Sequence, residues 1–129
     1  MMELNKGAIN LVPGQIGVYQ VYAVDGNGHP ITIARFCRQD LTGLLYIGQT
    51  NGQTLKTRLY KFYASAHPEM RTHNHSGAQK YFKNNAIRKK LGNHSLWFSY
   101  QISEAPKITE GRLLVDYFNT YGEYPPLNK

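Results

Sequence analysis

A change in hydrophobic period within residues 44–63 constrains the fold of this chain most strongly. Residues 44–47 are aliphatic or aromatic, which is typical of a partly buried strand. Residues 48–53 contain an Asn-Gly turn dipeptide, and Thr54 is a suitable N-cap for a helix. From Leu55 onward the apolar residues recur at steps of three and four, which predicts an amphipathic helix. This stretch therefore predicts a strand that runs through a glycine turn into a helix.

The same rules predict the other elements. They are strands at 15–24, 31–36 and 95–103, a helix from Gly77 to Leu91 capped by Ser76, a helix from Pro106 to about Tyr121, and a loose lead-in over residues 1–14. A chain of 129 residues, 41% of them apolar, is long enough for one core, so we expect a single domain over residues 1–129. The predicted fold class is α/β (α+β), with a small central mixed or antiparallel sheet of three or more strands flanked by helices.

The cysteine count and the hydropathy bear on the compartment. Cys37 is the only cysteine, so the chain forms no internal disulfide, which suits a reducing environment, and we expect a buried or semi-buried thiol there. No apolar run approaches the roughly 18 residues of a membrane span, and the start of the sequence has no signal-peptide core. We therefore expect a soluble, cytoplasmic protein that has no membrane partner.

The positive charge is concentrated in one part of the chain. Residues 54–92 carry nine basic residues against Glu69, a net charge of +8, whereas the remaining residues have a net charge of −1. Such concentration is typical of nucleic-acid binding, although a solvated helical face is the alternative. The histidines of the 73–75 triplet are expected in an exposed loop that contacts a nucleic-acid backbone, and not at a metal site. The candidate nucleic-acid-binding residues are Lys56, Lys61, Arg71, His73, His75, Lys80, Lys83, Arg88, Lys89 and Lys90.

Several short motifs occur in a specific order along the chain. They are Gly17-Val18-Tyr19 on the first strand, Tyr46-Ile47-Gly48 on a later strand, Arg58 in L-x-x-R-L, Glu110 in E-x-x-L-L and Asn128 in P-P-L-N. In sequence and order these motifs resemble those of the GIY-YIG nuclease family, and the resemblance covers nearly the whole chain. One such tripeptide alone would be weak support, whereas five ordered matches are specific.

The resemblance implies a role for each of these positions. Tyr19 is implied as the general base or water activator, and Tyr46 and Arg58 as the residues that orient the phosphate. Glu110 is implied as the ligand of a divalent metal, Mg²⁺ or Mn²⁺, and Asn128 as a support of the site. The implied substrate is DNA, either double-stranded or branched.

The residue types fit this chemistry, but each also has a structural explanation. An arginine binds phosphate bidentately, a carboxylate binds Mg²⁺, and a tyrosine accepts a proton only if its pKa falls below about 10. Alternatively, Tyr19 and Tyr46 are strand-packing aromatics, and Arg58 forms a structural ion pair with Asp116 or Glu110. The helix dipole favours a carboxylate at Glu110 if that residue lies in the first helical turn. Asn128 is alternatively a loop residue.

Two features depart from the family pattern. Tyr19 and Tyr46 are 27 positions apart, whereas family members more commonly have a short connection. The insertion at about 25–42 is therefore expected to add a strand or an extended hairpin at the edge of the sheet. Phe62 stands where many members carry a histidine or a tyrosine. Such a side chain can donate a proton or contact the phosphate, which phenylalanine cannot do. This role is either missing or supplied by another residue such as Lys56, Tyr60, His73 or His75.

These features together predict a metal-dependent endonuclease that hydrolyses DNA phosphodiester bonds. Two alternatives stay open: a nucleic-acid-binding protein on the same scaffold with weakened or absent catalysis, and a nuclease that acts on RNA. No separate targeting domain fits into 129 residues, so low sequence specificity is expected. Sequence specificity would otherwise have to come from the insertion, the 64–77 loop, a homodimer or a targeting partner protein.

Overall fold

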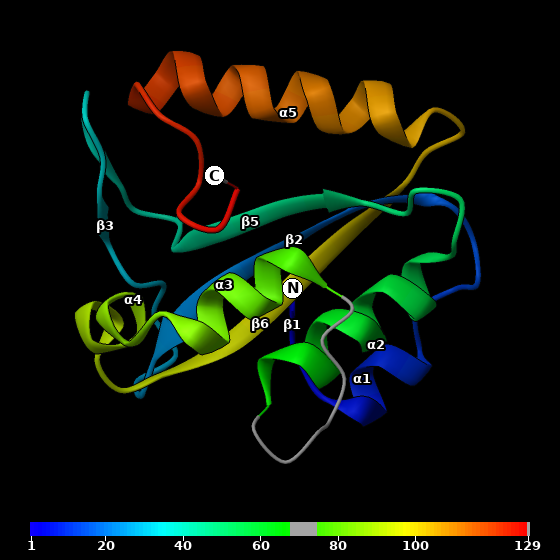
Figure 1. Ribbon diagram of the computed structural model, residues 1–129, viewed down its shortest axis with the longest axis horizontal. Helices are drawn as coiled ribbons and strands as arrows, with labels where there is room; N and C mark the ends of the chain where they lie inside the picture. The colour runs from blue at the N-terminus through cyan, green and yellow to red at the C-terminus, as the bar shows by residue number, and fades with distance from the viewer. Residues whose placement is uncertain (68–74, 129) are drawn as a thin grey trace.

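The computed structural model describes residues 1–67 and 75–128. Its centre is a four-stranded antiparallel sheet with the strand order β1-β6-β2-β5 (Figure 1). These strands are β1 (Met2–Glu3), β6 (His94–Ile102), β2 (Gly17–Asp25) and β5 (Leu44–Gln49). The two central strands, β2 and β6, pair along all nine of their residues. The prediction of a small sheet flanked by helices is confirmed, and the sheet is antiparallel throughout.

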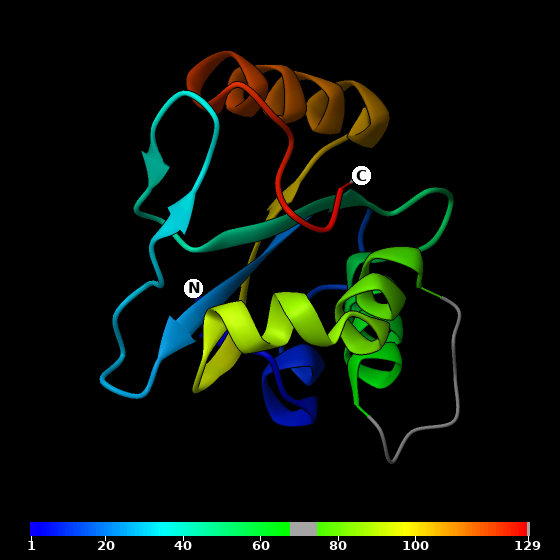
Figure 2. The ribbon, with the colours of Figure 1, turned by 60° about the vertical axis from the view of Figure 1, so that its left-hand side comes forward.

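Helices cover both faces of this sheet (Figures 1 and 2). On one face lies α5 (Pro106–Tyr121), and on the other lie α1 (Lys6–Asn10), α2 (Leu55–Ala66), α3 (Ser76–Lys83) and α4 (Asn85–Leu91). Tyr19 and Val21 of β2 belong to the core beneath α2, whereas Tyr22 packs with Tyr117 of α5. This division follows from the alternation of side chains along a strand. Within the described residues, no helix combines the length and apolar character that crossing a membrane requires.

The insertion at 25–42 forms a small sheet of its own beside the C-terminal end of α5. Its strands, β3 (Ile33–Ala34) and β4 (Gln39–Asp40), pair with each other and do not extend the main sheet. The buried carboxylate of Asp40 accepts a hydrogen bond from the Tyr117 hydroxyl at 2.7 Å. Arg35 and Glu123 form an ion pair at 2.8 Å. These contacts attach the insertion to α5 and to the segment that follows it.

Residues 1–14 are not the loose lead-in that was predicted. β1 pairs with β6, and the Asn5 side chain caps α1 by accepting a hydrogen bond from the amide of Ala8 at 2.8 Å. Leu4, Ile9 and Val12 are buried in the core. A two-residue strand and a five-residue helix are too short to show a hydrophobic period, so their structure comes from these tertiary contacts.

The predicted helix from Gly77 to Leu91 is in fact two helices. Asn84 adopts an extended conformation, ends α3, and caps α4 through a hydrogen bond from the amide of Ile87. The N-cap of α3 is His75 rather than Ser76. Cys37 was also wrongly predicted, because its thiol is exposed. In contrast, the predicted Thr54 cap of α2 and the extent of α5 are confirmed.

Candidate active site

The two motif tyrosines lie side by side on neighbouring strands. In the antiparallel pairing of β2 with β5, Tyr19 is opposite Gly48 and Val21 is opposite Tyr46. The ring centroids of Tyr19 and Tyr46 are 6.1 Å apart. A Cβ atom at Gly48 would lie 2.5 Å from Cζ of Tyr19 and 2.6 Å from Cε2 of Tyr46. Both rings therefore occupy the space that the absent side chain of Gly48 leaves open.

His75 is hydrogen-bonded to Tyr19 and was wrongly predicted to be an exposed loop residue. Its side chain is fully buried, and its Nε2 lies 2.6 Å from the Tyr19 hydroxyl oxygen. Its Nδ1 accepts a hydrogen bond from the amide of Ala78 at 3.2 Å, so the proton of the neutral ring is on Nε2. His75 therefore donates to the Tyr19 oxygen and leaves the Tyr19 hydroxyl proton free to point elsewhere.

Phe62 forms the wall against which His75 packs. The rings of Phe62 and His75 have centroids 4.8 Å apart, and those of Phe62 and Tyr46 are 5.8 Å apart. Phe62 is fully buried, so a polar side chain at this position would need a hydrogen-bond partner. Four residues were expected to replace a polar side chain at position 62; His73 lies outside the described residues, and His75 contacts Tyr19.

Burial changes the protonation of this cluster. It raises the pKa of Tyr19 well above its ordinary value, and it also raises the pKa of Tyr46. Burial, together with the nearby positive charge of Arg58, lowers the pKa of His75 to about 3. His75 is therefore neutral at pH 7, which agrees with the single ring proton deduced from its hydrogen bonds. Both tyrosines are protonated at that pH.

Arg58 and Glu110 complete the cluster from two different helices. The positive charge of Arg58 on α2 lowers the pKa of Tyr19 and Tyr46, and the negative charge of Glu110 on α5 raises both. Charges act in this way only at short range, since solvent and salt screen distant ones. The charges of Arg58 on α2 and Glu110 on α5 thus influence the titration of both tyrosines, which lie on β2 and β5.

The guanidinium of Arg58 is incompletely paired. Its Nε is buried and has no hydrogen-bond partner among the described residues. Over the same residues the one ion pair is that of Arg35 with Glu123, so the alternative of an Arg58 ion pair with Asp116 or Glu110 is wrong. A buried donor without a partner costs about 1–3 kcal/mol. Arg58 is therefore positioned to gain from an oxyanion that enters the site.

The Glu110 carboxylate is half-buried, and burial raises its pKa. It lies in the second turn of α5, not the first, because the helix begins at Pro106. The helix dipole therefore favours a carboxylate at position 110 less strongly than it would in the first turn. The described residues contain no group of three or more His, Cys, Asp or Glu side chains suited to a metal. Glu110 alone fits Mg²⁺ or Mn²⁺, because Mg²⁺ keeps several waters and needs only one or two carboxylates.

Asn128 holds the C-terminal segment against the edge of β5. Its Oδ1 accepts a hydrogen bond from the amide of Ile47, and its Nδ2 donates one to the carbonyl of Ile47, both at 2.8 Å. The backbone amide of Leu127 also donates to the carbonyl of Leu45. Both polar groups of the Asn128 side chain are thus used beside Tyr46. Asn128 is a positioning residue, and it is not the unconstrained loop residue of the alternative interpretation.

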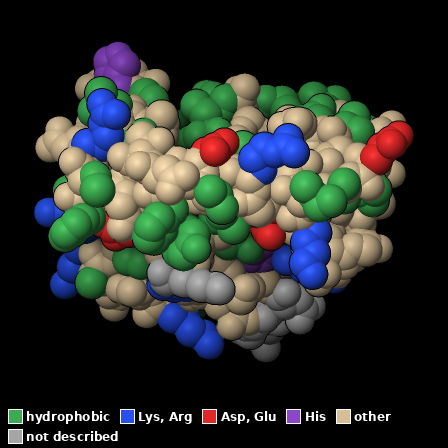
Figure 3. All heavy atoms as spheres, turned by 90° about the horizontal axis from the view of Figure 1, so that it is seen from above, with side chains coloured by type: hydrophobic (Ala, Val, Ile, Leu, Met, Phe, Trp, Pro, Cys, Tyr) green, Lys and Arg blue, Asp and Glu red, His purple; other side chains and the backbone are tan. Residues whose placement is uncertain are grey.

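Apart from His75, the predicted nucleic-acid-binding residues that the structure describes lie on α2, α3 and α4. Arg71 and His73 lie outside the described residues, and His75 is buried, so it is not a surface contact. Figure 3 shows the molecule from the side of α5, where acidic, basic and hydrophobic side chains are interspersed. That face is therefore not the concentrated basic surface predicted. The described basic candidates are Lys56 and Lys61 on α2, Lys80 and Lys83 on α3, and Arg88, Lys89 and Lys90 on α4.

Gly77 provides a test of how tightly this cluster packs. A Cβ atom at Gly77 would lie 2.6 Å from Cε1 of Tyr46, whereas one at Gly111 in α5 would meet nothing within 4 Å. We expect Gly77→Ala to lower the free energy of unfolding by about 1–3 kcal/mol through overpacking. Gly111→Ala should raise it by about 0.5–1 kcal/mol, the ordinary helix preference for alanine. Urea denaturation of both variants checks this, and effects of the same sign would contradict it.

Comparisons with known proteins do not identify the chain. No family model matches it, and neither the curated proteins nor the solved structures include a significant match. The resemblance to GIY-YIG nucleases therefore stays a prediction, based on the ordered motifs.

Proposed function

We propose that this protein is a metal-dependent endonuclease that hydrolyses DNA phosphodiester bonds. The observation that carries the proposal is the buried Nε of Arg58, which has no hydrogen-bond partner among the described residues, on a side chain whose charge acts on both Tyr19 and Tyr46, as does that of Glu110. Phosphodiester cleavage needs a cation for the developing phosphate charge, an activated water and a metal. Arg58, Tyr19 and Glu110 respectively meet these three needs.

In the proposed reaction Arg58 binds the scissile phosphate and donates to its non-bridging oxygens. Glu110 holds Mg²⁺ or Mn²⁺, which supplies Lewis-acid stabilisation of the phosphate oxygens when bound. Tyr19 accepts the proton of the attacking water, which requires its phenolate form. The positive charge of Arg58 favours that form, and so does the hydrogen bond donated by Nε2 of His75. Tyr46 and Asn128 keep β5 and the neighbouring rings in position.

A second candidate function is nucleic-acid binding without cleavage. Tyr19 is fully buried, and burial keeps its pKa far above neutrality. Unless DNA or metal binding lowers that pKa, Tyr19 stays protonated and activates no water. The protein would then bind DNA in a salt-sensitive manner through the lysines of α2–α4 without cutting it.

The two functions are separated by a cleavage assay with a matched pair of variants. Purified protein is incubated in Mn²⁺ with supercoiled, branched and single-stranded DNA, alongside Glu110→Gln and Glu104→Gln. Glu104 is exposed and precedes α5, so its variant makes the same chemical change away from the cluster. We expect cutting by the wild type and Glu104→Gln, and a loss of about 100-fold or more in Glu110→Gln.

Each other outcome of this assay has a definite meaning. Equal cutting by all three proteins would show that the assigned site is wrong or that the activity is a contaminant. If none of them cut but all bound DNA in a salt-dependent manner, the binding scaffold would be the better assignment. Matched DNA and RNA hairpins in the same assay distinguish the two nucleic acids.

A further inference from the structure

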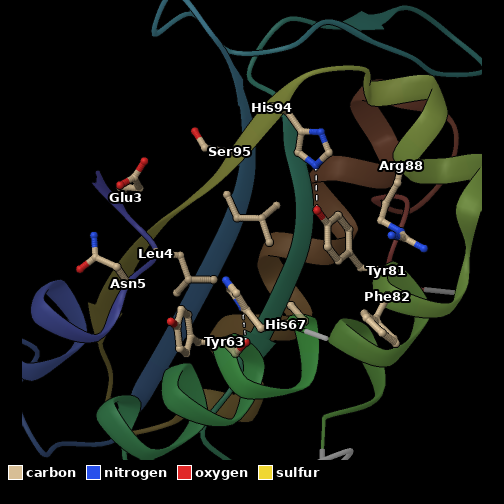
Figure 4. Close-up of a pocket in the computed structure, with 12 residues that line it drawn as sticks. Glu3, Leu4, Asn5, Tyr63, His67, Tyr81, Phe82, Arg88, His94 and Ser95 are labelled. Atoms are coloured by element: carbon tan, nitrogen blue, oxygen red, sulfur yellow. Dashed lines mark hydrogen bonds between the residues drawn. The ribbon is translucent and has the colours of Figure 1, made fainter. Parts of the chain in front are cut away.

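A pocket of about 450 Å³ opens between the C-terminal end of α2, the helices α3 and α4, and the β1–β6 edge of the sheet (Figure 4). Its floor is apolar and is made by Leu4, Ala66 and Leu96. Its volume lies in the range of small-molecule sites. None of the proposed catalytic residues lines it. The pocket is therefore separate from the cluster around Tyr19.

Two walls of the pocket present flat side chains. On one side the rings of Tyr63 and His67 have their centroids 4.1 Å apart and are tilted by 39° to each other. On the other side the guanidinium of Arg88 lies over the Phe82 ring, 5.6 Å from its centroid. Figure 4 shows these two pairs on different sides of the pocket, carried by α2 and by α3 and α4. Flat walls above an apolar floor suit a planar ring.

The polar groups of the pocket have unused hydrogen-bonding capacity at two ends. Nε of Arg88 has no hydrogen-bond partner among the described residues, whereas Nη2 of the same guanidinium donates to Oδ1 of Asn85, so only part of the guanidinium is left to donate to a ligand. At the other rim lies Glu3, an exposed carboxylate in Figure 4. Nδ1 of His67 donates to the carbonyl of Tyr63 at 2.6 Å, so Nε2 of the neutral ring is an acceptor, and it has no hydrogen-bond partner among the described residues. The pocket thus offers a cationic donor at one end and acceptors elsewhere.

The polar pair at the back of the pocket is already satisfied. Nδ1 of His94 donates to the carbonyl of Gly92 at 2.7 Å, and Nε2 then accepts from the Tyr81 hydroxyl at 2.8 Å. These bonds hold the Tyr81 ring in place and leave only its oxygen lone pairs for a ligand. Tyr81 and His94 therefore shape the pocket.

We propose that this pocket binds one unstacked nucleotide, with its base between the two flat walls and its phosphate toward Arg88. A base with an exocyclic amino group, such as cytosine, can donate that group to the Glu3 carboxylate, a pairing that carboxylates make with cytosine N4. The arginine is suited to the phosphate because its planar fork matches phosphate geometry. No metal and no bond cleavage are involved, so this binding goes beyond the proposed nuclease activity.

The position of the pocket also bears on the choice of substrate. From Arg58 to His67 is nine residues along α2, or about 13 Å, and from His75 to Tyr81 is six residues along α3, or about 9 Å. A strand with one phosphate at Arg58 reaches the pocket within a few nucleotides. Resting on the proposed nuclease function, this geometry favours single-stranded or branched DNA, whose bases can leave the stack, over intact duplex DNA.

The binding is tested by nuclear magnetic resonance on the whole chain at pH 7 without divalent metal. Deoxycytidine monophosphate, thymidine monophosphate and inorganic phosphate are titrated while the ring-proton signals of His67 and His94 are followed, with the exposed His29 as an internal control. We expect deoxycytidine monophosphate to shift His67 and His94 but not His29, and to bind at least about tenfold more tightly than phosphate. Because no cleavage is measured, the result does not depend on the proposed nuclease function.

Two variants with matched controls complete the test. Arg88→Gln should weaken deoxycytidine monophosphate binding by about tenfold, as loss of a hydrogen bond to a charged group predicts. Lys107→Gln, the same charge change at an exposed residue of α5 on the other face of the sheet, should change it less than twofold. Glu3→Gln should reduce the preference for cytosine over thymine. The proposal would be overturned by no shift of His67 and His94, by phosphate binding as tight as that of the nucleotide, or by equal effects of Arg88→Gln and Lys107→Gln.

Discussion

Arg58→Ala is expected to lower the rate of DNA cleavage by about 100-fold or more while the protein stays folded. Removing a preorganised group that stabilises transition-state charge typically has an effect of this size. The same substitution removes a buried guanidinium whose Nε has no partner among the described residues. The free energy of unfolding should therefore stay the same or rise, as is common where a functional group is held at a cost in stability. Cleavage kinetics and urea denaturation measure the two effects separately.

Two further variants make this prediction specific. Arg58→Lys keeps the charge but not the planar fork, so its cleavage rate should fall between those of the wild type and Arg58→Ala. Arg112→Ala removes one exposed positive charge from α5 and should leave cleavage nearly unchanged. A cleavage rate of Arg58→Ala within about twofold of wild type would show that Arg58 does not act on the scissile phosphate.

The stability of the protein is expected to fall as the pH is lowered from about 6.5, because His75 is buried in its neutral form. Burial lowers the pKa of His75 from 6.5 to about 3 in the folded protein, whereas the unfolded chain titrates near 6.5. Between these two values the unfolded state binds more protons, so the contribution is complete above pH 6.5. It decreases by as much as about 1.4 kcal/mol per pH unit as the pH falls towards 3.

His75→Asn is the control for this pH dependence. Asparagine is a good N-cap, so it can still accept the hydrogen bond from the amide of Ala78 that begins α3. It does not titrate, and its shorter side chain loses the hydrogen bond to Tyr19. Urea midpoints measured from pH 7 to pH 4 should therefore fall less steeply in His75→Asn than in the wild type. Equal slopes would mean that His75 is not responsible for the loss of stability.

Prediction and structure agree best for elements whose capping residues and hydrophobic period lie within or next to the element itself. Pro106 and Gly122 bracket α5, and Thr54 caps α2 as predicted. The sequence also pointed to Tyr19 and Tyr46 as parts of one site, and their ring centroids lie 6.1 Å apart. Periodic hydrophobicity and capping are local properties, so they can be read without knowledge of the fold.

The failures occur where a long-range contact decides the local structure. β1 and α1 are too short to be stable alone and form because Leu4, Ile9 and Val12 find the core. Asn84 interrupts the helix predicted over 77–91 and caps a new one instead. His75, in a polar stretch, gave no sign of burial. No sequence signal linked Glu3, Phe82 and Arg88 as parts of one pocket.

The sequence by itself predicted the order and type of most of the long elements and a small mixed or antiparallel sheet, and it showed the concentration of positive charge in residues 54–92. Only the tertiary structure decided that His75 donates a hydrogen bond to Tyr19, 56 residues away in the sequence. The same holds for Asn128, which accepts one from the amide of Ile47, 81 residues away. The tertiary structure also left Nε of Arg58 without a partner among the described residues. The physical reason is that local preferences depend on neighbouring residues, whereas burial and hydrogen-bond pairing depend on which distant surfaces the packed core brings together.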